Sequence, residues 1–249
     1  MTTMSFDAEH LQVRLSPRPV RYYPQADSTN DIALAWLGEG AEAGALVVTN
    51  EQVKGRGRKG RTWHTPAGTA LTFSVVLRPP AAHLHRVTML GAVAICELLD
   101  HLGAADVSIK WPNDVHLNGR KVSGVLPEAV WNGGQLSGVV LGIGINVSID
   151  FVGTDLADTA ISIAPALGRS VDRLEALAVV LARIDAWSAA LGSAALFDAW
   201  KGRLNTLGRQ VTIGDVQGRA EAVDDDGTLL VRDAAGALHR VLAGDIALG

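Results

Sequence analysis

A tract of glycines and cations at residues 54–61 is the feature that most constrains this chain. The tract, KGRGRKGR, carries five cations and three glycines, and no Asp or Glu occurs from Gln52 through Cys96. Because the whole chain has a formal net charge of -4, any attraction for an anion must come from such a local cluster. Glycine lets the backbone approach a ligand closely, and arginine offers paired donors to phosphate or carboxylate oxygens. Residues 46–48 and 70–77 are typical of buried strands, so the tract lies between two predicted strands. We therefore predict an anion-binding loop whose cations lack neutralising partners.

Three known motifs compete for this tract. Its glycines satisfy the GxGxxG pattern of dinucleotide-binding folds, but residues 62–66 do not open a helix, and no acidic ribose ligand follows about twenty residues on. Residues 55–62 approximate a P-loop, yet Arg61 stands where the lysine belongs, and the downstream helix is again lacking. RNA-binding Arg/Gly segments usually contain interleaved aromatic residues and lie in disordered chain. Strands flank this tract, so it fits that class less well. A nucleic-acid-binding module nevertheless stays open as the alternative outside the enzymes.

Composition excludes several classes of protein. A chain of 249 residues can form a catalytic domain with a small second domain, and its 48% hydrophobic and 19% charged residues are those of a globular protein. The single cysteine, Cys96, excludes an intramolecular disulfide framework and a CxxC site, and its apolar surroundings predict a small buried hydrophobe. The amino terminus lacks the apolar region of a signal peptide, and no uncharged stretch is long enough to span a bilayer. These features favour a cytoplasmic protein.

Apolar periodicity and turn signals divide the chain into three parts. Residues 1–20 show neither helical nor strand periodicity and predict an amino-terminal arm. Residues 21–206 predict a catalytic domain, and residues 207–249 predict a small domain of short strands. The elements expected in the catalytic domain are a helix that begins near residues 28–31, strands at 46–48 and 70–77, a helix over 83–101, an antiparallel meander over 107–147 with turns at 118–119 and 132–134, and helices over 172–191 and 194–204.

Five segments resemble the motifs of biotin protein ligases in sequence, order and spacing. They are residues 28–30 (STN), 51–63 (EQVKGRGRKGRTW), 110–114 (KWPND), 120–125 (RKVSGV) and 142–147 (GIGINV). The resemblance implies a mixed-sheet α/β catalytic domain similar to class II aminoacyl-tRNA synthetases, followed by a small SH3-like β-barrel. Two features depart from the family pattern. The chain has no room for the winged helix-turn-helix of members that repress transcription, and Pro127 predicts a strand edge or bulge.

The resemblance also implies a reaction in two steps. ATP activates biotin to biotinyl-5'-AMP with release of pyrophosphate, and biotin then passes to a lysine of the biotin carboxyl carrier domain of a carboxylase. Two anions meet in the first step, which requires cations, and the resemblance gives this role to Lys121 and Arg56. It gives Asp114 the task of orienting or deprotonating the acceptor lysine. Magnesium is expected with ATP, and no residue is assigned to bind it.

The ligands define the remaining expected contacts. The ureido ring of biotin is neutral and bipolar, so its pocket needs one donor and several acceptors within apolar walls. By resemblance, Trp63 stacks on adenine, and Gly124 leaves the backbone bare against the ligand. The expected biotin-binding residues are Ser28, Thr29, Asn30, Gln52, Gly55, Arg56, Gly57, Arg58, Lys121 and Gly124, and the expected nucleotide-binding residues are Arg58, Arg61, Trp63, Asn113 and Asn146.

Simpler roles compete with these assignments. In the simpler interpretation, Ser28 and Thr29 serve only as helix caps, and Trp63 is a core aromatic. Lys121 is then a surface lysine after a turn, and Asp114 has a structural role. Within the enzymes the alternative is a lipoate-type ligase. The expected partner is the carrier domain, without specific DNA or a membrane, and the expected state is a monomer or a weak homodimer. The glycine-rich tract is expected to be mobile without ligand and to become ordered over the adenylate.

Overall fold

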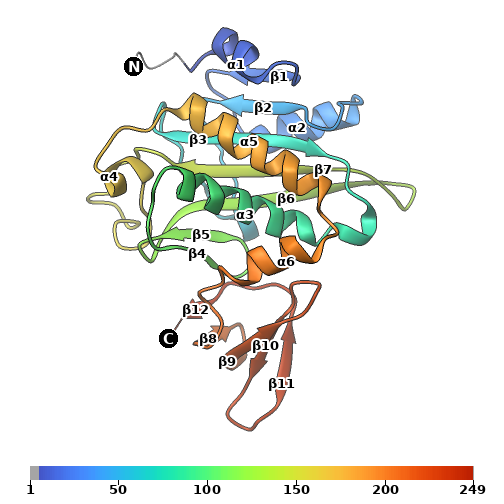
Figure 1. The fold of residues 1–249 in the computed structure, drawn as a ribbon, viewed down its shortest axis with the longest axis vertical. Helices are drawn as coiled ribbons and strands as arrows, with labels where there is room; N and C mark the ends of the chain where they lie inside the picture. Colours follow the sequence, from blue (N-terminus) through green and yellow to red (C-terminus); the bar gives the residue numbers. More distant parts are fainter. Residues whose placement is uncertain (1–5, 249) are drawn as a thin grey trace.

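The structure, a computed structural model, describes residues 6–248, and a seven-stranded sheet forms its centre (Figure 1). In the described part of this sheet, β1 and β2 pair in parallel, and all other neighbouring strands pair antiparallel. The sheet is therefore mixed, as predicted, and its strands from residue 107 onward form the predicted meander. In spatial order the strands are β1 (Val20–Tyr23), β2 (Leu46–Thr49), β3 (Ala70–Leu77), β7 (Gln135–Asn146), β6 (Arg120–Asn132), β5 (Asp114–Leu117) and β4 (Val107–Lys110).

The predicted helices are present, with some ends shifted by a few residues. No helix within residues 6–248 combines the length and apolarity needed to cross a bilayer. The α-helices are α1 (Ala8–Leu15), α2 (Thr29–Gly38), α3 (Arg86–His101), α4 (Ile163–Leu167), α5 (Arg173–Ala189) and α6 (Ala194–Lys201), and two short 3-10 helices are η1 (Arg58–Gly60) and η2 (Ala81–His83).

Helices cover both faces of the sheet, and the strand register shows which face each helix takes. On one face lie α3 and α5, and a Cβ atom on Gly91 of α3 would press against Val125 and Leu141. On the other face lies α2, whose Leu37 contacts the backbone of Gly138 in β7. Successive strand residues point to opposite faces, so Gly138 and Leu141 face opposite ways. With cover on both sides, every residue of β3 is buried, as expected of a central strand.

The prediction that residues 1–20 lack regular structure is wrong for the part that the structure describes. Asp7 caps α1 by accepting a hydrogen bond from the amide of His10, and Leu11 is completely buried. Arg14 donates two hydrogen bonds of 2.9 Å to Glu175 of α5. The helix is short, so its few apolar residues gave too weak a periodic signal, and packing against α5 stabilises it.

Pro127 lies within β6, at a free edge of the ladder, in agreement with the prediction. The short strand β5 pairs with β6 only as far as Gly124, so beyond that point β6 has β7 as its one neighbour. Proline lacks the amide hydrogen that a second neighbour would require. The same shortening of β5 leaves space beside β6, where the carboxyl-terminal domain approaches.

The carboxyl-terminal strands form a separate five-stranded antiparallel sheet, in agreement with the prediction of a small β domain. It lies below the central sheet in Figure 1, and two tryptophans contact it. The indole of Trp111 donates to the carbonyl of Gly227 at 2.8 Å, and a Cβ atom on Gly227 would lie 3.8 Å from the ring of Trp200. The strands, in spatial order, are β11 (Leu238–Val241), β10 (Leu229–Arg232), β9 (Val216–Val223), β8 (Gln210–Ile213) and β12 (Ala247–Leu248).

Candidate functional site

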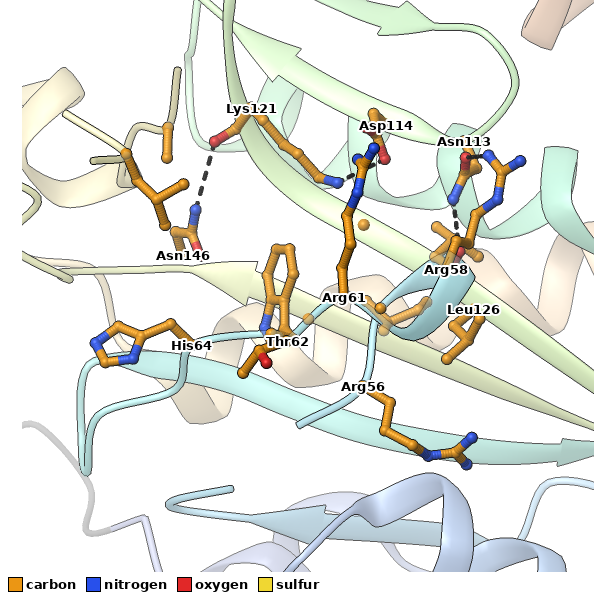
Figure 2. A pocket seen from close by; sticks show the side chains of 18 of the residues that line it. Arg56, Arg58, Arg61, Thr62, His64, Asn113, Asp114, Lys121, Leu126 and Asn146 are labelled. Carbon is orange, nitrogen blue, oxygen red and sulfur yellow. Dashed lines mark hydrogen bonds and ion pairs between the residues drawn. The ribbon is translucent and has the colours of Figure 1, made fainter. Parts of the chain in front are cut away.

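A cavity of about 620 Å³ lies on the α2 face of the central sheet and collects most of the predicted site (Figure 2). Its walls come from the start of α2, the glycine-rich tract, strands β3 to β7 and the carboxyl-terminal domain. Gly55 is the predicted residue that does not line it, because this glycine lies against the backbone of Trp63. The predicted residues that line it are Ser28, Thr29, Asn30, Gln52, Arg56, Gly57, Arg58, Arg61, Trp63, Asn113, Asp114, Lys121, Gly124 and Asn146.

Paired glycines form the floor of the cavity. Gly124 of β6 and Gly144 of β7 are directly opposite each other in the ladder. A Cβ atom on Gly144 would overlap the indole of Trp63, and one on Gly124 would touch the same ring at 3.4 Å. Trp63 is half-buried, and its indole nitrogen has no hydrogen-bond partner. The ring therefore lies against bare strand backbone beside the cavity, not in the apolar core.

Polar side chains at the start of α2 form one end of the cavity. The amide and hydroxyl of Thr29 donate to Gln52 Oε1 at 2.8 and 3.1 Å, and the Ser74 hydroxyl lies 2.8 Å from that of Thr29. Ser28 occupies the N-cap position, but its hydroxyl caps no backbone amide. The cap interpretation therefore does not hold for Ser28. Ser74 was missed in the sequence, where Thr72 and Ser74 alternate as the polar residues of an otherwise apolar strand.

An ion pair occupies the opposite side of the cavity. The ammonium of Lys121 lies 2.7 Å from Asp114 Oδ1, and the two side chains are 32% and 28% exposed. A second lysine, Lys110, also lines the cavity and pairs with Asp114 across strands β4 and β5. Burial lowers the pKa of Lys110, and Asp114 opposes that shift. The structure thus brings Lys121 and Asp114 together, as the motif positions imply, and adds a lysine that sequence reasoning did not assign.

The cations of the glycine-rich tract are mostly paired with acids, which corrects the expectation that they lack partners. Arg61 lies 2.7 Å from Asp245 of the carboxyl-terminal domain, and Lys59 lies 3.4 Å from the same carboxylate. Lys54 pairs with Asp27 at 2.8 Å. The acids come from segments distant in sequence, so a window around the tract could not show them. These pairs are exposed and are therefore weak enough to exchange for a ligand anion.

Arg58 differs from the other tract cations because neutral groups hold it. Its guanidinium donates to Asn113 Oδ1 at 2.5 Å and to the Gly244 carbonyl at 3.4 Å (Figure 2). The amide of Asn113 in turn donates to the Val125 carbonyl at 2.7 Å. Within residues 6–248 no acid forms an ion pair with Arg58, so its positive charge stays uncompensated at the cavity wall. Asn113, in the turn at residues 110–114, holds the guanidinium in place.

Arg56 is not brought to Lys121, contrary to their expected joint role. It forms two hydrogen bonds with Glu128, of 3.1 and 2.8 Å, and one with Asp31 of 2.6 Å. The hydrogen bond with Glu128 raises the pKa of Arg56. Figure 2 shows its side chain pointing away from the Lys121–Asp114 pair. Glu128 also accepts a 2.6 Å hydrogen bond from Asn30, so one carboxylate ties the tract to α2.

Asn146 and Cys96 both have structural roles. Asn146 donates to the carbonyls of Ile161 and Lys121, at 3.1 and 3.4 Å, and holds the segment beyond β7 against the cavity. Burial raises the pKa of the Cys96 thiol to about 12, so this residue is a buried hydrophobe, as predicted. Across residues 6–248, His, Cys, Asp and Glu form no group of three or more that could bind a metal ion.

Comparison with known proteins agrees with the motifs and the fold. The family described as "Biotin/lipoate A/B protein ligase family" matches residues 22–146, and "Biotin protein ligase C terminal domain" matches residues 206–249. The biotin--[acetyl-CoA-carboxylase] ligase of Paracoccus denitrificans is 37% identical over 85% of this chain and 93% of its own length. The corresponding ligase of Mycobacterium tuberculosis is 33% identical, over 89% and 86%. A structure of the Aquifex aeolicus biotin protein ligase in complex with biotin and ATP superimposes with a TM-score of 0.78 and 28% identity, covering 93% of this chain and 98% of that one.

Proposed function

This chain belongs to the biotin protein ligase family, and on that premise we propose that it joins biotin to a lysine of a carrier protein in two ATP-dependent steps. The protein is an ATP-dependent biotin ligase. The observation that carries the residue assignments is that one cavity has a neutral polar end at Thr29 and Gln52 and a cationic side at Lys121 and Arg58. Biotin has the matching division, with a ureido ring at one end and a carboxylate at the other.

The ureido ring binds at the α2 end of the cavity. Gln52 Oε1 already accepts from Thr29, which leaves the Gln52 amide and the Ser28 hydroxyl to meet the ring. Gly124 and Gly144 let the ligand approach the sheet, and the exposed side of the Trp63 ring offers a stacking surface. These contacts are neutral and directional, so they select a ureido group over a simple acid.

The first step joins two anions, and the cations beside the cavity make their approach possible. A carboxylate oxygen of biotin attacks the α-phosphorus of ATP and forms an O–P bond, while the bond from that phosphorus to the bridging oxygen breaks and pyrophosphate leaves. Lys121 lies where it can neutralise the carboxylate, and Arg58 and Arg61 hold the phosphates by exchanging their present partners for phosphate oxygens. Arg56 joins this group only if a ligand draws it away from Glu128 and Asp31.

The second step needs an uncharged lysine amine from the carrier. The amine attacks the acyl carbon of biotinyl-5'-AMP, an amide forms, and AMP leaves. Asp114 accepts a hydrogen bond from the entering ammonium and orients it beside Lys121. The partner in this step is the biotin carboxyl carrier domain of a carboxylase.

Magnesium accompanies ATP in this proposal, and the phosphates supply most of its ligands. Within residues 6–248 no three His, Cys, Asp or Glu side chains form a metal-binding group, so any protein contribution would be at most one or two carboxylates. Bound magnesium would neutralise phosphate charge. We also propose that the protein works in the cytoplasm, where ATP is available.

Separate assays of the two steps test this function. Biotin-dependent pyrophosphate release measures the first step, and labelling of a purified carrier domain measures the second. We expect both with biotin and neither with lipoate, because the ureido contacts have no counterpart in lipoate. Calorimetry with an oligonucleotide should give no tight binding. Release of pyrophosphate with lipoate but not with biotin would replace the proposal with the lipoate alternative.

A further inference from the structure

His116 is a titratable residue of the cavity that the reaction described above does not use. It lies on β5, where alternate residues face opposite ways: Asp114 and His116 line the cavity, and Val115 and Leu117 are buried in the core. His116 is therefore on the same side of the same strand as the carboxylate expected to receive the carrier lysine.

A β-bulge brings His116 opposite Lys121. Val115 pairs with Ser123, but His116 pairs with Lys121, so the register skips Val122. In a regular ladder the buried Val122 would stand opposite the imidazole. The bulge instead turns Lys121 toward the cavity beside His116, and its ammonium reaches back along β5 to Asp114. The three side chains form one row.

One hydrogen bond fixes which imidazole nitrogen carries the proton. Nδ1 of His116 lies 3.1 Å from the carbonyl oxygen of Gly119, and a carbonyl can only accept. Nδ1 is therefore the protonated nitrogen, and Nε2 keeps its lone pair. The carbonyl belongs to the Asn118–Gly119 turn, whose φ values of 51° and 73° are those of a tight hairpin turn. The turn that joins β5 to β6 thus also orients the imidazole.

The surroundings keep the imidazole uncharged at neutral pH. Burial lowers the pKa of His116, and the positive charges of Lys110 on β4 and Lys121 on β6 lower it further. Asp114 on its own strand raises it, and the Gly119 carbonyl acts in the same direction. Because burial is the largest effect, the imidazole is neutral at neutral pH, and its Nε2 carries no proton.

We propose that His116 accepts, on Nε2, the proton that the carrier lysine must lose before it attacks biotinyl-5'-AMP. This inference rests on the proposed function and adds a proton acceptor to its second step. The lysine ammonium gives one proton to Nε2 and becomes a neutral amine. The amine then forms the C–N bond, the C–O bond to AMP breaks, and the second amine proton leaves with the AMP phosphate or solvent. A carboxylate that already holds an ammonium, as Asp114 does, is a poor acceptor for that first proton.

Single-turnover transfer from preformed biotinyl-5'-AMP to the carrier domain tests the inference. We expect His116→Phe to form adenylate at the wild-type rate and to slow transfer about ten- to hundredfold at pH 7, the usual effect of losing a general base. The wild-type transfer rate should level off above the pKa of His116. That of the variant should continue to rise about tenfold per pH unit as the lysine itself loses its proton.

Two further variants separate proton transfer from structure. His116→Gln keeps a side-chain N–H for the Gly119 carbonyl but offers no titrating base, so it should transfer as slowly as His116→Phe. His101→Phe is the matched control: it removes an exposed imidazole at the end of α3 that does not line the cavity. Its transfer rate should equal that of the wild type.

The outcomes distinguish this inference from the function on which it rests. A wild-type protein that neither forms adenylate nor labels the carrier contradicts the function. If the wild type performs both steps, then wild-type transfer by His116→Gln, or an unchanged pH profile in His116→Phe, overturns the inference alone. Slow transfer by both variants, with normal adenylate formation and a normal His101→Phe control, supports it.

Discussion

The Lys121 ammonium lies 2.7 Å from the Asp114 carboxylate, on neighbouring strands of one sheet. The two residues are seven positions apart, and the hairpin turn at Asn118 and Gly119 folds their strands together. The pair keeps a cation and its counter-ion ready before any ligand arrives. A biotin carboxylate that enters next to Lys121 must therefore compete with Asp114 for the ammonium.

Removing the Lys121 cation should stop the first step. We expect Lys121→Ala to slow biotin-dependent pyrophosphate release about 10²- to 10³-fold, because the two reacting anions lose the charge that stabilises their approach. The melting temperature should hardly change, since the side chain is 32% exposed. The matched control is Lys54→Ala, which removes a cation of the tract that pairs with Asp27 and does not line the cavity. Pyrophosphate release near the wild-type rate in Lys121→Ala would contradict the role of Lys121 in the first step.

Removing Arg58 should let the adenylate escape. Arg58→Gly deletes the one tract cation that neutral groups hold, and with it a phosphate contact that retains the intermediate. We expect adenylate synthesis to continue, with labelling of bystander proteins in addition to the carrier, read by a biotin blot.

The control for Arg58 is Lys59→Gly. Lys59 has a φ of 56°, which glycine adopts without strain, and it does not line the cavity. If Arg58→Gly labels carrier and bystander proteins in the wild-type ratio, Arg58 does not retain the adenylate.

A single methyl group on the cavity floor should weaken ligand binding. In Gly144→Ala the new Cβ atom overlaps the Trp63 indole and pushes it from the sheet. We expect the dissociation constant for biotinyl-5'-AMP to rise at least about tenfold, which corresponds to about 1.4 kcal/mol. Gly38→Ala, which meets no atom within 4 Å, is the control. Equal affinity in the two variants would show that ligand binding does not depend on the position of the Trp63 indole.

The glycine-rich tract should become ordered when the adenylate binds. Its cations pair with acids across exposed contacts, and glycine makes the segment costly to fix. Phosphate oxygens of the adenylate can replace those acids as partners of the cations and hold the tract in one conformation. Hydrogen exchange at residues 53–62 should slow with adenylate and less with biotin alone. Equal protection in the free and liganded protein would mean that the loop is preformed.

DNA should bind weakly and without sequence preference. The formal net charge is -4, and the acids that pair with the tract reduce its pull on phosphate. Titration of labelled duplexes at physiological salt measures this. Nanomolar, sequence-selective binding would contradict the prediction.

Local signals in the sequence were enough for the mixed sheet, the meander, the small carboxyl-terminal β domain and the positions of the motifs. Turn residues such as Asn118 and Gly119 act within a few residues, and apolar periodicity reports which face of an element is buried. The helix α1 escaped because eight residues carry little periodicity, and its stability comes from distant contacts such as Arg14 with Glu175.

The sequence by itself determined which segments line the cavity, because KWPND, the glycine-rich tract and the segment that contains Lys121 are contiguous motifs. Only the tertiary structure decided their partners. Asp245 meets Arg61 across 184 positions of sequence, and Glu128 meets Arg56 across 72, so no window around the tract could show that its charges are neutralised. The bulge that sets His116 opposite Lys121 is likewise a property of the strand pairing. Charge interactions depend on distance in space, and the folded chain alone fixes that distance.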